Sequence, residues 1–246
     1  MSLTLIRGIN RLGLFTGIKT YLKISKRRKI LKLPELAHPI NLRSEPSDYL
    51  ILKQIFMHGE YDIPFSFNPQ YIIDGGASIG LFAILFATRF KNASIVAIEP
   101  QRTKFQQLEL NTGYYNNITA VQATIWNKLC NLEILISGSE DWSFYVTEIA
   151  AMRGALNALS INHIMKMYSW PYIDIVKLDV GGSEQRIFED NYQWIPKTKV
   201  IIIELHDQHF PNSSHTFRVA MAKYNFAETQ HGESLIFTNQ SPVDIS

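Results

Sequence analysis

The residues best suited to chemistry in this chain are a glycine-rich stretch at 74–80, with the sequence DGGASIG, and the later acid Glu99. Small residues let a backbone approach a ligand closely, and the start of a helix presents N–H groups without partners. A carboxylate about 20 residues further along is well placed to accept the two ribose hydroxyls of an adenosine. The pattern therefore predicts a site for an adenosine-containing cofactor.

The spacing of the small residues distinguishes two classes of cofactor. A dinucleotide-binding turn, G-x-G-x-x-G, needs glycine at position 77, where this chain has Ala77. The alternative pattern, acid-x-G-x-G-x-G, fits if serine replaces the middle glycine, as in Asp74, Gly76, Ser78 and Gly80. We therefore expect S-adenosylmethionine, while NAD and an ordinary strand–helix unit without a cofactor remain alternatives.

A candidate proton acceptor is the second feature of the sequence, because an acceptor that takes up a group from the cofactor commonly needs a base close to it. Asp179 and His206 each end an apolar run, so both should emerge at the carboxyl edge of a parallel sheet, where ligands bind. We predict His206 as the base, with a pKa near neutrality, and Asp179 as a second catalytic residue. Asp141, in a polar loop, is a further candidate. Alternatively, His206 only caps its strand, and Asp179 orients the cofactor or holds Lys177.

Carboxylates near the same edge raise the question of a metal. Asp179, Glu204 and Asp207 could gather around Mg²⁺, which prefers oxygen ligands. The single cysteine, Cys130, rules out a zinc site built from several cysteines and an internal disulfide framework. Magnesium is kept as an alternative, and no metal ligand is predicted.

Five β–α repeats are expected to position these residues. The predicted parallel strands are the apolar runs at 71–73, 94–98, 118–125, 173–180 and 200–206. Two further strands, at 226–230 and 234–238, form a hairpin that closes the chain. An extra strand at 132–136 and a short helix at 160–168 are expected in a less regular region. This order predicts an α/β fold with a doubly wound, mostly parallel, seven-stranded Rossmann-like sheet ending in an antiparallel hairpin.

Charge is unevenly distributed along the chain. Nine of the 24 basic residues lie within 1–33, which contains no acid, so the remainder has 15 basic and 22 acidic residues. Apolar residues recur at helical spacing through 1–24, and the basic cluster KRRK follows at 26–29. Such a segment can sit on an anionic membrane, and the alternatives are a solvated tail and a helix packed on its own domain. The acidic remainder argues against nucleic acid as a partner.

The chain is expected to have two parts. A basic N-terminal helical extension and linker is predicted at 1–46, followed by one cofactor-binding domain at 47–246. No apolar run in the sequence reaches the roughly 18 residues of a membrane span, and no signal-peptide pattern is evident. We expect a cytoplasmic protein, with residues 1–33 as the segment that contacts the inner face of a membrane.

Several motifs together resemble the FkbM-type S-adenosylmethionine-dependent methyltransferases. Besides the glycine-rich stretch, these are INLR at 40–43, GEY at 59–61, AIEP at 97–100, IWN at 125–127, DIVKLDVGGSE at 174–184 and IELH at 203–206. The resemblance implies O-methylation, commonly of a sugar hydroxyl in a glycan, glycolipid or natural product. The partner would be a small-molecule or glycan acceptor with a hydroxyl group, and the oligomeric state is left open.

One position departs from the pattern of that family, which usually has an acid where this chain has Gly181. If that acid binds substrate or metal, the protein would be a catalytically weak or inactive binding protein with the same fold. Glycine could equally make room for a larger acceptor. A nicotinamide-dependent oxidoreductase is the less favoured alternative.

The motifs and the resemblance together assign the site residues. Cofactor contacts are predicted from Asp74, Gly76, Ala77, Ser78, Gly80, Glu99, Pro100, Ile125 and Asp179. The predicted catalytic residues are His206 and Asp179.

Overall fold

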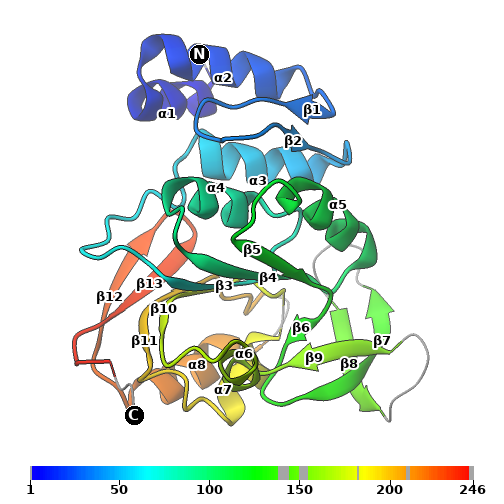
Figure 1. Cartoon of the computed structure of the whole chain (residues 1–246), viewed down its shortest axis with the longest axis vertical. Coiled ribbons are helices and arrows are strands. Elements are labelled where there is room, and N and C mark those ends of the chain that lie inside the picture. The colour runs from blue at the N-terminus through cyan, green and yellow to red at the C-terminus, as the bar shows by residue number, and fades with distance from the viewer. Residues whose placement is uncertain (1, 138–143, 150–154, 182, 209–210, 244–246) are drawn as a thin grey trace.

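A seven-stranded sheet forms the centre of the molecule (Figure 1). The computed structural model describes residues 2–137, 144–149, 155–181, 183–208 and 211–243. The strand order is β12–β13–β11–β10–β3–β4–β5, with bounds Tyr71–Gly75 (β3), Ser94–Ile98 (β4), Ile118–Val121 (β5), Ile173–Leu178 (β10), Thr198–Ile203 (β11), Phe226–His231 (β12) and Ser234–Asn239 (β13). The strands from β5 to β11 are parallel, and β13 is antiparallel to both neighbours. This confirms the predicted sheet and its closing hairpin.

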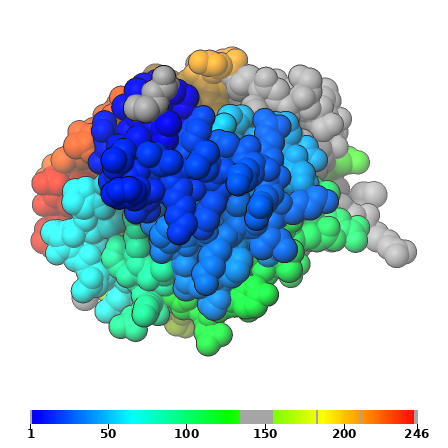
Figure 2. Space-filling model, turned by 90° about the horizontal axis from the view of Figure 1, so that it is seen from above, coloured from blue at the N-terminus to red at the C-terminus, as the bar shows by residue number. Residues whose placement is uncertain are grey.

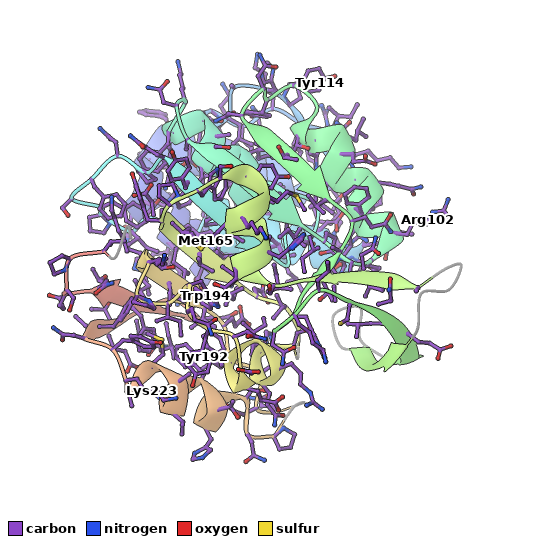
Figure 3. All side chains as sticks on the ribbon, turned by 60° about the horizontal axis from the view of Figure 1, so that its bottom comes forward. Arg102, Tyr114, Met165, Tyr192, Trp194 and Lys223 are labelled. Atoms are coloured by element: carbon purple, nitrogen blue, oxygen red, sulfur yellow. The ribbon has the colours of Figure 1, made fainter. Side chains whose placement is uncertain are left out.

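Helices cover both faces of this sheet (Figure 1). One layer contains α3 (Pro46–Phe56), α4 (Leu81–Arg89) and α5 (Arg102–Thr112), and the other contains α6 (Ile161–Tyr168), α7 (Glu184–Glu189) and α8 (Ser213–Met221). Successive strand residues point to opposite faces, so Ile72 packs in the first layer and Ile73 in the second. Met165 and Trp194 belong to the second layer (Figure 3). Burial on both faces explains why the residues of the central strands are mostly large and apolar.

The sheet reverses its order between β3 and β10. From β3 the chain leads outward through β4 and β5, and it then crosses to β10 and β11 on the other side of β3. Asp74 of β3 lies opposite Lys177 of β10 in the ladder. Doubly wound sheets bind ligands at such a reversal, beyond the carboxyl ends of the strands.

A second sheet, of four strands, lies beside the first (Figure 1). Its order is β6 (Thr124–Ile125), β9 (Leu156–Leu159), β7 (Cys130–Ser137) and β8 (Phe144–Ile149). The prediction of one strand over 118–125 is wrong, because the chain leaves the main sheet after Val121 and Ile125 pairs with β9. The expected strand at 132–136 lies within β7, whereas β8 and β9 have no counterpart in the prediction.

The N-terminal segment forms two helices and a short hairpin that cover the α3–α5 layer (Figures 1 and 2). These elements are α1 (Leu3–Leu12), α2 (Leu14–Ser25), β1 (Ile30–Leu31) and β2 (Ile40–Asn41). Gly13, with a φ of 80°, separates the helices. A Cβ at Gly17 would lie only 2.7 Å from the carbonyl oxygen of Gly8, so the glycines that weaken each helix allow the pair to cross closely.

Arg11 attaches this helix pair to the rest of the molecule. Its guanidinium contacts Glu35 and Asp62 and donates to the carbonyl of Phe56, at the end of α3, at 2.8 Å. No helix among the described residues is long and apolar enough to cross a bilayer.

Candidate active site

A cavity of about 430 Å³ opens where the sheet reverses, at the ends of β3, β4, β10 and β11. Helix α3 contributes Ser47, Leu50, Ile51 and Gln54 to its lining. The segments after the strands contribute Gly76, Ser78, Glu99, Pro100, Asp179, Gly181, Glu204 and His206, and β6 contributes Ile125. The volume lies within the range of small-molecule sites, so a cofactor can enter.

The glycine-rich turn after β3 passes the backbone of Asp179 at very short range. Gly76 has a φ of +73°, and a Cβ there would lie 1.7 Å from the carbonyl oxygen of Asp179. The N–H groups of Gly76 and Ala77 donate to the carbonyl of Ile98 at 3.0 and 2.9 Å. Only glycine therefore fits at position 76, between the ends of β4 and β10.

Glu99 lies in the cavity wall at the end of β4, with 5% of its surface exposed. Its carboxylate oxygens accept the N–H groups of Ser78 at 2.9 Å and Gln101 at 2.8 Å. Burial raises the pKa of Glu99, although Lys104 and the two N–H donors oppose that shift. A carboxylate has about four acceptor positions, so Glu99 retains lone pairs for the hydroxyl groups of a ligand.

A buried lysine connects the turn to the end of β10. Lys177 Nζ lies 3.2 Å from Asp74 Oδ1 and 3.8 Å from Asp179 Oδ2, and it donates to the Gly76 carbonyl at 2.9 Å. Burial lowers the pKa of Lys177, but Asp74 and Asp179 raise it further, so the net shift is upward and the lysine is charged. Lys177 thereby fixes the turn relative to Asp179.

The cavity brings together most of the residues predicted for the cofactor, namely Gly76, Ser78, Glu99, Pro100, Ile125 and Asp179. Asp74, Ala77 and Gly80 do not line it. Asp74 is fully buried against Lys177, Ala77 is bound through its N–H to Ile98, and Gly80 packs on Leu108. The motif specifies the path of the backbone as well as ligand contacts, so we infer that these three residues determine the conformation of the turn.

His206 lies among three carboxylates beyond the end of β11. Its Nδ1 is 2.6 Å from Glu184 Oε1, and its Nε2 is 3.7 Å from Asp179 Oδ1 and 3.6 Å from Glu204 Oε1. Glu184, the first residue of α7, is fully buried, whereas the side chains of Asp179 and Glu204 are 39% and 28% exposed. Glu184 thus anchors one ring nitrogen, and the other faces the two cavity carboxylates.

The protonation of this group differs from the prediction. Burial lowers the pKa of His206, but the hydrogen bond with Glu184 and the nearby carboxylates raise it more, to about 9. Burial, together with Asp179, raises the pKa of Glu204 to about 7. At neutral pH His206 is therefore largely an imidazolium, and Glu204 is partly protonated. The predicted pKa of His206 near neutrality is wrong because sequence does not reveal its buried carboxylate partner.

The same side chains offer a set of metal-ligand atoms. One atom each from Asp179, Glu204 and His206 lies within 4.8 Å of the others. Asp207, considered above as a magnesium ligand with Asp179 and Glu204, instead accepts hydrogen bonds from Ser214 and does not line the cavity. Asp141 lies outside the described residues.

Two acids beside His206 are absent from the predicted catalytic residues. Glu184 ends the motif DIVKLDVGGSE, and Glu204 lies in IELH, so both positions were visible in the motifs, and Glu204 was considered as a metal ligand, but the contact of Glu184 with His206 was not foreseen. Gly181, the position that departs from the family pattern, lines the same cavity with a φ of +57°. The residue that replaces the usual acid of the family therefore lies in the wall of the cavity.

A doubly wound sheet with a closing hairpin, and a glycine turn and acid at its reversal, defines a Rossmann-like methyltransferase fold. The model of the methyltransferase FkbM domain matches residues 74–228. The chain belongs to this family, as its motifs indicate. The matched range includes the turn, Glu99, and the carboxylates around His206.

Relatives with methyltransferase names support the same assignment. The chain is 31% identical over 105 residues to "Methyltransferase 1" of Beauveria bassiana (strain ARSEF 2860), an alignment that covers 42% of this chain and 38% of that protein. It is 33% identical over 73 residues to "Methyltransferase sdnD" of Sordaria araneosa, which covers 30% and 28%, so well under half of either relative is matched. The structure of methyltransferase FkbM from Methylobacillus flagellatus KT shares the fold, with a TM-score of 0.50 and 14% identity over 90% of this chain and 58% of that chain.

Proposed function

We propose that this protein transfers a methyl group from S-adenosylmethionine to a hydroxyl group of a sugar in a glycan, glycolipid or natural product. One observation carries the proposal: Glu99 with its glycine turn, and Glu204 with His206, line the same cavity. A cofactor and an acceptor hydroxyl can then be held together in one space, and such positioning supplies much of the rate in a direct transfer.

The residues around the turn fit S-adenosylmethionine. Glu99 would accept the ribose hydroxyls, Pro100 and Ile125 offer apolar contacts for the adenine, and Asp179 offers a carboxylate to the ammonium group. The bare backbone at Gly76, where no Cβ fits, suits a ligand that lies directly against the chain. When bound, this cofactor supplies an electrophilic methyl group.

The rest of the lining suits an acceptor with several hydroxyl groups. Gln54, Gln208, Glu204 and Glu233 bring amide and carboxylate groups to the cavity. Gln54 and Glu233 are joined by a hydrogen bond of 3.1 Å, which holds both side chains in place. Amides and carboxylates bind hydroxyl groups well. Leu50, Ile51, Val180 and Leu205 add apolar surface, so the lining suits an acceptor with both hydroxyl groups and apolar faces, as a sugar has.

Glu204 is the proton acceptor in this proposal. With a pKa of about 7 it is partly ionised at neutral pH, and a base works best when its pKa is close to the working pH. The O–H bond of the acceptor breaks, and its proton passes to a carboxylate oxygen of Glu204. His206, held by Glu184, carries the positive charge that favours the ionised form of Glu204 and is a positioning residue.

Calorimetric titration of the full chain with S-adenosylmethionine and with NAD tests the cofactor. We expect S-adenosylmethionine to bind, and Glu99→Ala to weaken binding by about 1.5–3 kcal/mol, the value of a hydrogen bond to a charged group. Glu109→Ala removes an exposed acid of α5 outside the cavity and should leave affinity unchanged. Unchanged affinity in a folded Glu99→Ala protein would reject this role for Glu99, and binding of NAD alone would reject the cofactor.

Transfer itself is measured with S-adenosylmethionine that carries a labelled methyl group and a panel of glycans, glycolipids and glycosylated natural products. We expect label on a hydroxyl oxygen, in an ether that resists mild alkali. Label on nitrogen or on a carboxylate would contradict O-methylation of a sugar. Tight cofactor binding with no transfer to any member would favour the catalytically weak alternative that Gly181 raises.

A further inference from the structure

Helix α2 turns an apolar stripe toward solvent. Phe15, Ile18 and Leu22 follow the spacing i, i+3, i+7, and Phe15 is 88% exposed. Gly17, Thr20 and Ile24 are the buried residues of this helix and pack toward the molecule. Because packing already uses the other side of α2, the exposed stripe is not needed for the core, and large exposed apolar patches mark interaction surfaces.

Cations surround this stripe. A second cavity, of about 610 Å³, lies between α2 and β1 and is lined by Phe15, Ile18, Lys19, Leu22, Lys23, Lys26, Arg28, Ile30, Leu31, Lys32 and Pro39. None of the described residues that line it is acidic. Lys19, Lys26 and Arg28 are exposed, and the face is seen from above in Figure 2. We call this surface the α2–β1 groove.

We propose that the α2–β1 groove docks the protein on the surface of an anionic phospholipid bilayer. Lipid phosphates would contact Lys19, Lys26 and Arg28, while Phe15 and Leu22 enter the boundary between headgroups and acyl chains. An amphipathic helix with basic flanks binds such a surface through both buried apolar area and charge. The basic side chains of the groove then contact lipid phosphates, and its apolar side chains contact the lipid acyl chains.

A nucleic acid would complement only the basic side chains of this surface. Its phosphates could reach the lysines, but the aliphatic and aromatic side chains of the stripe would find no apolar partner along a phosphate backbone. The groove shares no lining residue with the cavity at the sheet reversal, so substitutions in the groove leave the lining of that cavity unchanged. The proposal therefore stands apart from the identity of the methyl acceptor.

Co-sedimentation of the full chain with vesicles tests this proposal. We expect binding to vesicles of phosphatidylcholine with phosphatidylglycerol, weaker binding as salt rises, and none to phosphatidylcholine alone. The double variant Lys19→Gln/Lys26→Gln should lower the partition coefficient by about 30-fold, and Phe15→Ser by about tenfold or more. These positions are exposed, so circular dichroism should show unchanged folding.

Matched controls use exposed residues of the same types elsewhere. Lys91→Gln/Lys166→Gln and Leu110→Ser should bind vesicles like the native chain. Failure of the native chain to bind anionic vesicles, or equal loss in the controls, would overturn the proposal. Binding to a single-stranded RNA that falls with the lysine variant but not with Phe15→Ser, without vesicle binding, would assign the groove to nucleic acid. Self-association abolished by Phe15→Ser, again without vesicle binding, would assign it to a second copy of the chain.

Discussion

Glu184 and Glu204 both approach His206, but their surroundings give them different tasks. Glu184 is fully buried and bonded to the imidazole at 2.6 Å, so it fixes the ring and favours its charged form. Glu204 is partly exposed in the cavity wall, 3.6 Å from the other ring nitrogen, where an acceptor can reach it. In the proposed reaction Glu184 therefore orients the imidazole, and Glu204 takes up the proton of the acceptor.

Glu204→Gln should lower kcat by about 10²–10⁴-fold while cofactor affinity stays nearly constant, because a positioned base contributes that much. In the native protein kcat should rise with pH through about 7, as Glu204 loses its proton. Glu204→Gln should remove this limb, and His206→Asn should move it to higher pH, because the imidazolium charge that lowers the pKa of Glu204 is lost. Steady-state rates between about pH 5 and 10 check both shifts.

Glu109→Gln, outside the cavity, serves as the control and should keep the native pH profile. A Glu204→Gln protein with more than about a tenth of the native kcat would move the base to Asp179 or His206. Activity lost on chelation and regained with Mg²⁺ would instead make Asp179, Glu204 and His206 a metal site.

Local motifs made part of this site predictable. Gly76 and Glu99 belong to one strand–turn–helix–strand unit, so their spacing in the sequence fixes their place in the fold. Glu184 and His206 are 22 residues apart, on different elements, and meet only because α7 and the end of β11 converge. The pKa of each group depends on that burial and contact, which no spacing in the sequence encodes.

At the level of elements, the turn after β3 is the part of the site least able to change. Gly76→Ala would place a methyl group against the fixed carbonyl of Asp179, at a φ of +73°. We expect a loss of unfolding free energy of about 2 kcal/mol or more, together with loss of cofactor binding. Chemical denaturation and calorimetric titration measure the two effects.

The matched control is Gly113→Ala, where φ is −59° and the position is the C-cap of α5. Alanine fits that backbone, so stability should change by no more than about 1 kcal/mol. If Gly76→Ala retained both native stability and native affinity, the close approach of the two strand ends would not constrain the site.

The strands were predictable where helical layers cover both faces of the sheet. Strands such as β11, whose last four residues are all large and apolar, are followed by polar segments, so their pattern identifies them. The apolar run from β5 into β6 misled the prediction, since neither glycine nor proline marks the change of sheet at Gln122 and Ala123. Pairing between distant strands decides that boundary, and it is not a local property.

For the molecule as a whole, the N-terminal segment is part of the core. Ile24, Leu31, Leu33, Ile40 and Leu42 belong to the same hydrophobic cluster as the α4 residue Phe82. Helix α3 lies below this segment and also lines the cavity at the sheet reversal. The basic charge of 1–33 was visible in the sequence, but packing against the domain was only an alternative there, because the glycines at 8, 13 and 17 weaken the helical pattern.

Arg11→Met should lower the free energy of unfolding by about 1–3 kcal/mol, because the Phe56 carbonyl loses its side-chain donor and Glu35 its close partner, while Arg89 still pairs with Asp62. Thermal and chemical unfolding check this value. Arg186→Met breaks an exposed pair with Glu189 on α7 and should cost no more than about 1 kcal/mol. Equal effects of the two variants would mean that α1 is not anchored through Arg11.

The close crossing of α1 and α2 also sets how this segment can diverge among relatives that share it. Position 17 has backbone atoms of Gly8 and Ile9 within 2.8 Å of any added Cβ, so even alanine would force the helices apart. Phe15, Ile18 and Leu22 are exposed, so polar residues can replace them without disturbing the packing. We expect such replacements in relatives that are not under selection for membrane docking. A sequence survey should therefore find a nearly fixed glycine at 17, and a stripe that changes in concert with the neighbouring lysines.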